Sequence, residues 1–141
     1  MSLTVDRALV GRELDRTTFG PVTVEQIAAY AAAYGDTDPR WAGRGPDPVA
    51  PPTFALSLRT DRGMAAHVPV QADRTSLDAG KDIEFGAPVR PGDLLTAVST
   101  LSDIYEKTGR TGRMTFTVFR TTVTNQRGEI VAIIDQKMMF R

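Results

Sequence analysis

Two aspartates two positions apart, in a turn bounded by glycine and proline, have the clearest potential for chemistry in this chain. Asp36 and Asp38 lie between Gly35 and Pro39, directly after a stretch with helical periodicity. Gly35 can adopt the left-handed conformation that ends a helix, and aspartate side chains accept hydrogen bonds from nearby backbone amides. Pro39 keeps the chain from becoming helical again. The turn is therefore either a helix stop or the loop that carries the carboxylate base of an active site.

The composition describes a chain with balanced charge and no cysteine. Its 141 residues include 17 basic and 17 acidic side chains, which gives a formal net charge of zero. This balance argues against nucleic acid or an anionic membrane as a partner, because both favour a basic excess. The chain has neither a signal-peptide core nor an apolar run of about 20 residues, the length that spans a membrane. One cytoplasmic domain over residues 1–141 is expected.

Two helices are expected in the first half of the chain. Thr23 and Gln26 have the spacing of a capping box, and apolar residues at helical spacing predict a helix over 24–34 with one buried face. A second helix is predicted over about 52–62. Proline is tolerated where it begins, and the side chains that follow are apolar on nearly all sides.

The second half of the chain has the alternating pattern of strands. After an irregular stretch at 64–80, strands are expected around 82–85, 94–101 and 114–123, and a last one over 130–140 follows a hairpin turn at 125–128. A short strand or turn is expected at 9–14. Two helices followed by about four antiparallel strands predict an α+β domain in which the sheet curls around the helix at 52–62.

A sheet wrapped around an apolar helix is the hot-dog arrangement, and four motifs resemble one family with this fold. Residues 34–39 are similar to the signature of the MaoC-like hydratases, which are (R)-specific enoyl-thioester hydratases and dehydratases. Residues 49–54 resemble the start of the central helix in the branch similar to the N-terminal dehydratase domain of type I fatty-acid synthase. Residues 88–93 and 124–129 resemble a strand-linking turn and the final hairpin of that branch. The resemblance implies an acyl-CoA or acyl-carrier-protein thioester as substrate.

The residue that completes the family's catalytic pair is missing from this chain. The family motif runs Gly-Asp-x-Asn-Pro-x-His, and its Asp and His together activate a water for addition to an enoyl thioester. The resemblance assigns the Asp to Asp36, the Asn position to Asp38 and the His position to Trp41. An indole N–H donates a hydrogen bond but neither accepts one nor titrates. Asp36 alone, with an ordinary pKa of about 3.9, would be a weak base at neutral pH.

The other candidate site residues are expected to bind substrate rather than to transfer protons. Trp41 is interpreted as a wall of the acyl pocket, or alternatively as an aromatic that shields the core. Asp38 is expected to bond its own turn beside the substrate. The backbone amides of Thr53 and Phe54, at the start of the second helix, could stabilise a thioester oxygen. No metal-ligand constellation, nucleophile elbow or phosphate-binding glycine loop is found, so neither a metal nor a cofactor is expected.

Three functions remain open. The favoured one is the non-catalytic, acyl-binding half of a heteromeric hydratase or dehydratase whose hot-dog partner carries the histidine. A self-sufficient homodimeric hydratase or thioesterase is the second, with Asp36 assisted by His67, the only histidine, or by Asp78 of the facing subunit. The third is a non-enzymatic acyl-CoA-binding module. Cations at one turn could meet coenzyme A phosphates or an acidic carrier protein, although a charged hairpin tip is the simpler interpretation: Lys107, Arg110 and Arg113.

Overall fold

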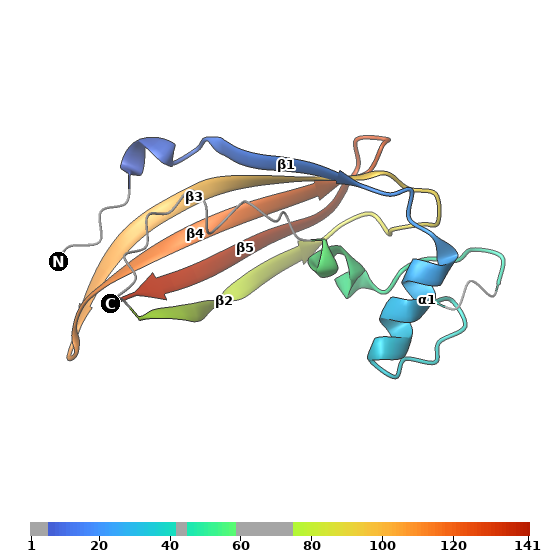
Figure 1. Cartoon of the computed structure of the whole chain (residues 1–141), viewed down its shortest axis with the longest axis horizontal. Helices are drawn as coiled ribbons and strands as arrows, with labels where there is room; N and C mark the ends of the chain where they lie inside the picture. The colour runs from blue at the N-terminus through green and yellow to red at the C-terminus, as the bar shows by residue number, and fades with distance from the viewer. Residues whose placement is uncertain (1–5, 42–44, 59–74) are drawn as a thin grey trace.

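The structure, a computed structural model, describes residues 6–41, 45–58 and 75–141. Five strands form one antiparallel sheet in the order β1-β3-β4-β5-β2 (Figure 1). This is the hot-dog fold that the sequence predicts. The strands have the following bounds: β1 Glu13–Phe19, β2 Ser76–Phe85, β3 Leu95–Gly109, β4 Gly112–Thr124 and β5 Ile130–Phe140.

Helix α1, Val24–Ala33, lies at one end of the sheet (Figure 1). Its capping box is confirmed: the Thr23 side chain accepts a hydrogen bond from the Gln26 amide, and the Gln26 side chain accepts one from the Thr23 amide. The helix ends where Gly35 takes a φ of +69°, the left-handed conformation expected of a helix stop. Short-range signals therefore define both ends of this helix.

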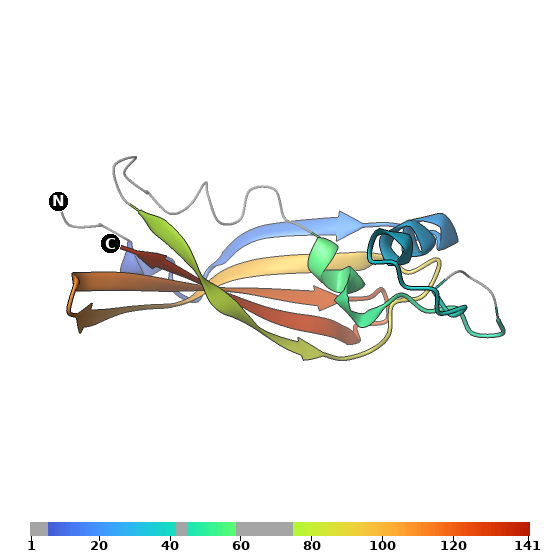
Figure 2. The same cartoon turned by 90° about the horizontal axis from the view of Figure 1, so that it is seen from below.

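The second predicted helix is shorter than expected and of a different type. It is a 3-10 helix, η2, from Pro52 to Ser57, and the backbone at Leu58 is extended; the predicted residues 59–62 lie outside the described part of the chain. In an α-helix the carbonyl of Phe54 would accept from the Leu58 amide. Here the Ser57 hydroxyl donates to that carbonyl at 2.7 Å, and the Leu58 amide bonds Ala55 instead. The competing side-chain bond thus favours the tighter helix. Figure 2 shows η2 beside the sheet, where it contacts β5.

Three strands differ from the sequence prediction. β1 occupies 13–19, after a short 3-10 helix at Arg7–Leu9, instead of the predicted 9–14. β2 begins at Ser76, inside the stretch expected to be irregular, and β3 continues to Gly109. Bulges explain the last two errors, because register shifts after Asp78 in β2 and after Leu101 in β3 interrupt the two-residue alternation.

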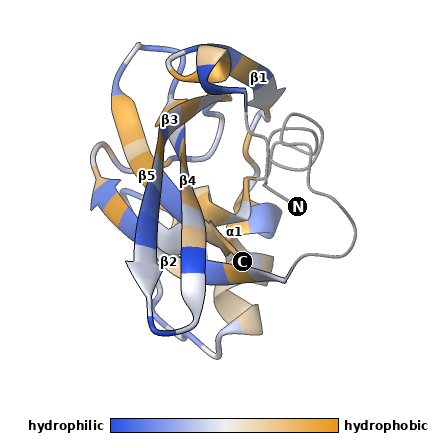
Figure 3. Ribbon diagram, turned by 90° about the vertical axis from the view of Figure 1, so that its left-hand side faces the viewer, coloured by the Kyte–Doolittle hydropathy of each residue, from blue (hydrophilic) through white to orange (hydrophobic). Residues whose placement is uncertain are grey.

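The core lies on the face of the sheet that carries α1 and η2. At that end Leu95, Ala97 and Val123 from the strands pack with Ile27 of α1 and Phe54 of η2. A second cluster lies farther along the sheet from α1: Leu101, Ile104, Phe119 and Phe140, with Leu9 and Leu14 packed against them. The alternation of hydrophobic and hydrophilic residues along the strands is visible in Figure 3. No helix in the described residues has the length and apolar character needed to cross a membrane.

Candidate functional site

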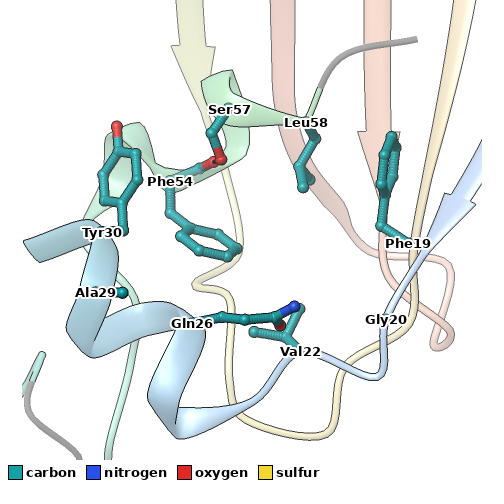
Figure 4. A pocket seen from close by; sticks show the side chains of 9 residues that line it. All are labelled: Phe19, Gly20, Val22, Gln26, Ala29, Tyr30, Phe54, Ser57 and Leu58. Carbon is teal, nitrogen blue, oxygen red and sulfur yellow. Dashed lines mark hydrogen bonds between the residues drawn. The ribbon is translucent and has the colours of Figure 1, made fainter. Parts of the chain in front are cut away.

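A pocket of about 440 Å³ lies between α1, the end of β1 and η2 (Figure 4). Phe19 and Val22 form its wall on the β1 side, and Phe54 and Leu58 form the wall on the η2 side. Ligand sites in proteins are typically concave, largely apolar and roughly 300–1,000 Å³ in volume. The pocket therefore has the size and chemistry to take an apolar chain.

One face of α1 completes the pocket. Gln26, Ala29 and Tyr30 are spaced i, i+3 and i+4, so they share a face of the helix, next to the stripe that buries Ile27 and Ala31. The side chain of Ala29 is a single methyl group, which leaves the space open. The helix thus buries one face in the core and presents the adjoining face to the pocket.

Tyr30 connects α1 to η2 beside the pocket. Its hydroxyl lies 2.9 Å from the carbonyl oxygen and 3.1 Å from the hydroxyl of Thr53, and 3.3 Å from the hydroxyl of Tyr34. Its ring meets Phe54 edge-on, with the centroids 5.4 Å apart. The hydrogen bond with Tyr30 raises the pKa of the exposed Tyr34. These contacts hold the two helical elements at a set separation.

A buried carboxylate lies behind the pocket wall on the β1 side. Asp93, only 2% exposed, accepts hydrogen bonds from the Gln126 amide group at 2.9 Å, the Arg127 guanidinium at 3.1 Å and the Arg90 backbone at 2.9 Å. Burial alone would raise the pKa of Asp93, but these hydrogen bonds outweigh it and the net effect lowers the pKa. The Asp93 carbonyl in turn accepts from the amide of Val22, at 2.9 Å. The turn at Asp93 therefore positions one pocket wall.

Gly20 is required where β1 meets this turn. Its φ is +115°, and a Cβ built there would lie 2.6 Å from the Asp93 carbonyl oxygen. A larger residue would push the end of β1 away from the turn. The close approach of Gly20 to the Asp93 carbonyl thus fixes the position of the pocket wall that Phe19 and Val22 form.

In the Asp36–Trp41 turn, both oxygens of the Asp36 carboxylate accept hydrogen bonds. Oδ1 accepts from the Asp38 amide at 3.0 Å, and Oδ2 accepts from the indole Nε1–H of Trp41 at 2.8 Å. Trp41 is 8% exposed and belongs to the core. The motif carboxylate and the residue at the motif's histidine position are therefore bonded to each other within the turn.

Arg40 and Asp38 complete the turn. The Arg40 guanidinium forms a forked ion pair with the Asp38 carboxylate, with a closest distance of 2.6 Å, and stacks 4.7 Å from the Trp41 ring centroid. The hydrogen bonds from Arg40 lower the pKa of Asp38. The Arg40 amide also donates to Asp38, so the prediction that Asp38 bonds its own turn is confirmed.

The structure separates the predicted site residues into two groups. Asp36, Asp38 and Trp41 come together in their turn and do not line the pocket. Phe54 lines the pocket. The Thr53 carbonyl accepts a hydrogen bond from the hydroxyl of Tyr30, which also lines the pocket. Of the two interpretations of Trp41, its place in the core matches the shielding aromatic.

The expected pair of free amides at the second helix needs correction. The Phe54 amide donates to the Pro51 carbonyl at 2.9 Å, so it is not available to a thioester oxygen. The 3-10 geometry is the cause, because i+3 hydrogen bonds satisfy an amide that would be unpaired in the first turn of an α-helix.

Of the two alternative bases, His67 and Asp78, the structure describes only Asp78. His67 lies outside the described residues. Asp78 lies near the start of β2, at the end of the sheet away from α1 (Figure 1). Its carboxylate accepts from the Gly80 amide at 2.8 Å and the Gln136 side chain at 2.9 Å, and these hydrogen bonds lower the pKa of Asp78. A lowered pKa makes Asp78 a weaker base.

The sequence motifs could not identify several of the residues that line the pocket. Phe19, Val22 and Leu58 come from three separate segments, so only the folded chain brings them together. Gln26, Ala29 and Tyr30 did carry a signal, because they form one helix face beside the buried stripe, with a small residue at its centre.

Comparison with known proteins agrees with this geometry. The family model of the FAS1-like dehydratase domain region matches residues 8–134. A UPF0336 protein of Streptomyces griseus is 31% identical over 99% of this chain and 97% of its own. The structure of a MaoC-like dehydratase from Rhodospirillum rubrum has a TM-score of 0.69 at 24% identity, covering 92% of this chain and 90% of that chain. A HadBC (3R-hydroxyacyl-ACP dehydratase) complex from Mycobacterium tuberculosis has a TM-score of 0.64 at 25% identity, covering 93% and 96%. With the family model spanning nearly the whole sheet and both helical elements, the chain belongs to the FAS1-like dehydratase-region family and has its hot-dog fold.

Proposed function

We propose that this chain is the acyl-binding subunit of an (R)-specific enoyl-thioester hydratase or 3-hydroxyacyl-thioester dehydratase in the cytoplasm. A hot-dog partner subunit supplies the Asp/His pair. The observation that carries the proposal is the hydrogen bond from the Trp41 indole to Asp36, 2.8 Å long, at the two motif positions where an active subunit needs Asp and His. The substrate is an acyl-CoA or acyl-carrier-protein thioester.

The chemistry divides between the two subunits. Hydration needs a water directed at Cβ of the enoyl group, a proton relay to Cα, and donors for the thioester oxygen. Trp41 has no acceptor nitrogen, so this chain cannot relay the proton through that position. Its pocket instead buries the acyl chain, and each methylene removed from water contributes about 0.8 kcal/mol. The role of this chain is to hold and orient the substrate.

The edge of β2 that pairs with no other strand of the described sheet is the surface proposed for the partner subunit. β2 is an edge strand, and all ten of its residues are exposed. Leu77, Ile83 and Phe85 are large apolar residues on it, and Phe85 is 47% exposed. An edge strand with exposed apolar side chains is prone to pair with another chain. Support also comes from the similarity to HadBC, a 3R-hydroxyacyl-ACP dehydratase whose structure is that of a complex.

A complementation assay tests the proposal. The purified chain is mixed with a MaoC-like subunit that carries the complete Asp/His motif, and loss of enoyl-CoA absorbance is followed. We expect little turnover from this chain alone and a marked gain when both are present. A matched control replaces the motif histidine of the partner with tryptophan, the residue at position 41 here, and should abolish the gain.

The outcome separates the three functions. Strong hydration by this chain alone supports a self-sufficient homodimer and overturns the proposal. Tight acyl-CoA binding without turnover beside any competent partner supports a binding module instead. Asp36 as a catalytic residue, and Asp38, Trp41, Thr53 and Phe54 as substrate contacts, stay predictions that the same assay can examine by substitution.

A further inference from the structure

The hairpin between β3 and β4 extends beyond the rest of the described sheet. Pairing of β3 with β1 ends at Thr100, and pairing of β4 with β5 ends at Thr115. From Lys107 to Met114 the two strands pair only with each other. This part of the hairpin, together with Glu106, is named here the hairpin tip (residues 106–114), and it projects as a two-stranded ribbon at the end of the sheet away from α1 (Figure 1).

The hairpin tip carries a positive excess in a chain whose formal net charge is zero. Lys107, Arg110 and Arg113 are its cations, and Glu106 is its single acid. Arg113, with 59% of its side chain exposed, lies 3.7 Å from Glu106. Within the described part of the chain, no carboxylate lies within 4 Å of Lys107 or Arg110. Two cations are thus available to an external acidic group.

The Lys107 ammonium group lies over two stacked aromatic rings. Tyr105 and Phe116 face each other across the strands and stack with their ring centroids 5.0 Å apart. The Lys107 ammonium lies 5.5 Å from the first ring and 5.7 Å from the second, within the range of cation–π attraction. The contact orders a long side chain while its charge stays at the surface.

We propose that the hairpin tip docks the acidic face of an acyl carrier protein; this inference rests on the function proposed above. The three cations surround the ribbon instead of converging on one point. Lys107 pairs with Met114 and Thr108 pairs with Arg113, so by strand alternation Lys107 and Arg113 project from opposite faces, and Arg110 lies in the turn between them. A phosphate site needs converging donors, whereas a protein surface can meet charges spread around a projection.

The position of the tip assigns it to the partner's site. Fourteen residue steps of β3 separate Leu95, near α1, from Gly109, a path of roughly 45 Å along the strand, so the tip does not lie over this chain's own pocket. In a pair joined along β2 by a two-fold axis, the two β2 strands run antiparallel. The tip of this chain then lies at the end where the partner's counterpart of α1 and its catalytic motif are located.

Binding of a purified acyl carrier protein, with and without its prosthetic arm, tests the proposal on this chain alone and on its complex with a His-bearing partner. The variant replaces all three cations: Lys107→Gln, Arg110→Gln and Arg113→Gln. The control makes the same change of net charge at exposed arginines away from the tip: Arg12→Gln, Arg16→Gln and Arg120→Gln. We expect the tip variant to bind about tenfold more weakly at low salt, with little difference at high salt, and the control to bind like the parent chain.

Turnover in the complex provides a second readout. The tip variant should raise KM for a carrier-bound enoyl substrate and leave KM for the matching enoyl-CoA unchanged. Equal binding by tip variant and control overturns the proposal. A parallel rise of both KM values does so too, because it assigns the tip to coenzyme A phosphates or to folding. Carrier binding by the chain alone needs no turnover, so it tests the tip even if the complementation assay fails.

Discussion

The turn that follows α1 and the pocket that borders α1 differ in what their side chains do. In the turn, the Asp36 carboxylate, the Trp41 indole and the Asp38–Arg40 ion pair satisfy one another, and Trp41 is anchored in the core. In the pocket, largely apolar walls border about 440 Å³ that the described side chains leave open. The turn carries two carboxylates but does not line the pocket, whereas the described residues that line the pocket include no carboxylate and no histidine.

On the proposed function, this contrast explains how a chain without the proton relay keeps the hot-dog fold. An Asp/His pair must leave lone pairs and protons free to reach a water. An Asp/Trp pair uses the same two positions as a hydrogen bond that closes the turn onto the core. The pocket does not depend on that bond, because α1, Gly20 and the Asp93 turn position its walls. Substitutions in each region should therefore have separable effects on stability and on activity.

The largest expected effect is on stability, from Trp41→Ala. Removing a buried tryptophan leaves a cavity in the core and frees both partners of the indole, so the free energy of unfolding should fall by about 3–4 kcal/mol. Urea unfolding followed by circular dichroism measures it. Trp41→Phe keeps most of the packing and loses the donor, which should cost about 1–2 kcal/mol. Equal stability of the alanine variant and the parent chain would show that the turn does not anchor the helix.

Asp93→Asn tests how the Asp93 turn stabilises the pocket wall, and how that stability depends on pH. The folded state lowers the pKa of Asp93, so its carboxylate contributes stability above the unfolded value of about 3.9, and that stability is lost as pH falls through the folded pKa. The variant should therefore be less stable than the parent by about 2 kcal/mol at pH 7. The difference should shrink in strongly acidic solution. Urea unfolding at pH 7 and in strongly acidic solution measures this difference in the free energy of unfolding. A difference that does not change with pH would contradict the lowered pKa of Asp93.

Filling the pocket tests its role in binding. Ala29→Phe places a ring where the α1 face borders the pocket, so the activity of the complex with a His-bearing partner should fall at least about tenfold, or about 1.4 kcal/mol. Ala32→Phe is the matched control, because Ala32 is an exposed alanine of the same helix outside the pocket. Stability should change by less than about 0.5 kcal/mol in both. Unchanged turnover in the Ala29 variant would show that the acyl chain binds elsewhere.

These regions also differ in how far the sequence could predict them. The capping box of α1, the stop at Gly35 and the bounds of β5 were predicted correctly because their signals are local. Bulges at Asp78 and Leu101 break the alternation that reveals strands, and the Ser57 hydroxyl changes the type of the second helix. Each of these errors comes from one side chain or one inserted residue that outweighs the pattern around it.

The candidate site shows the same limit. The turn residues are close in sequence, so their meeting could be predicted, but the bond from Trp41 to Asp36 depends on how the indole packs into the core. The pocket joins β1, α1 and η2, which are separated by loops in the chain. A motif search locates residues that act together within a few positions, whereas a cavity needs the tertiary arrangement.

Asp36→Asn has the smallest expected effect and separates the two regions most sharply. An asparagine Oδ1 can still accept one of the two hydrogen bonds, while its NH₂ group replaces the other acceptor, so the free energy of unfolding should fall by about 0.5–1 kcal/mol. Because the partner supplies the proton relay in the proposed function, the activity of the complex should stay within about twofold. A catalytic carboxylate would instead lose a factor on the order of 10²–10⁴. The same substitution at the motif aspartate of the partner is the control and should abolish turnover. A large loss of activity from Asp36→Asn in this chain would instead place the Asp36 carboxylate at the substrate. The turn, and not the pocket, would then be the functional site of the subunit.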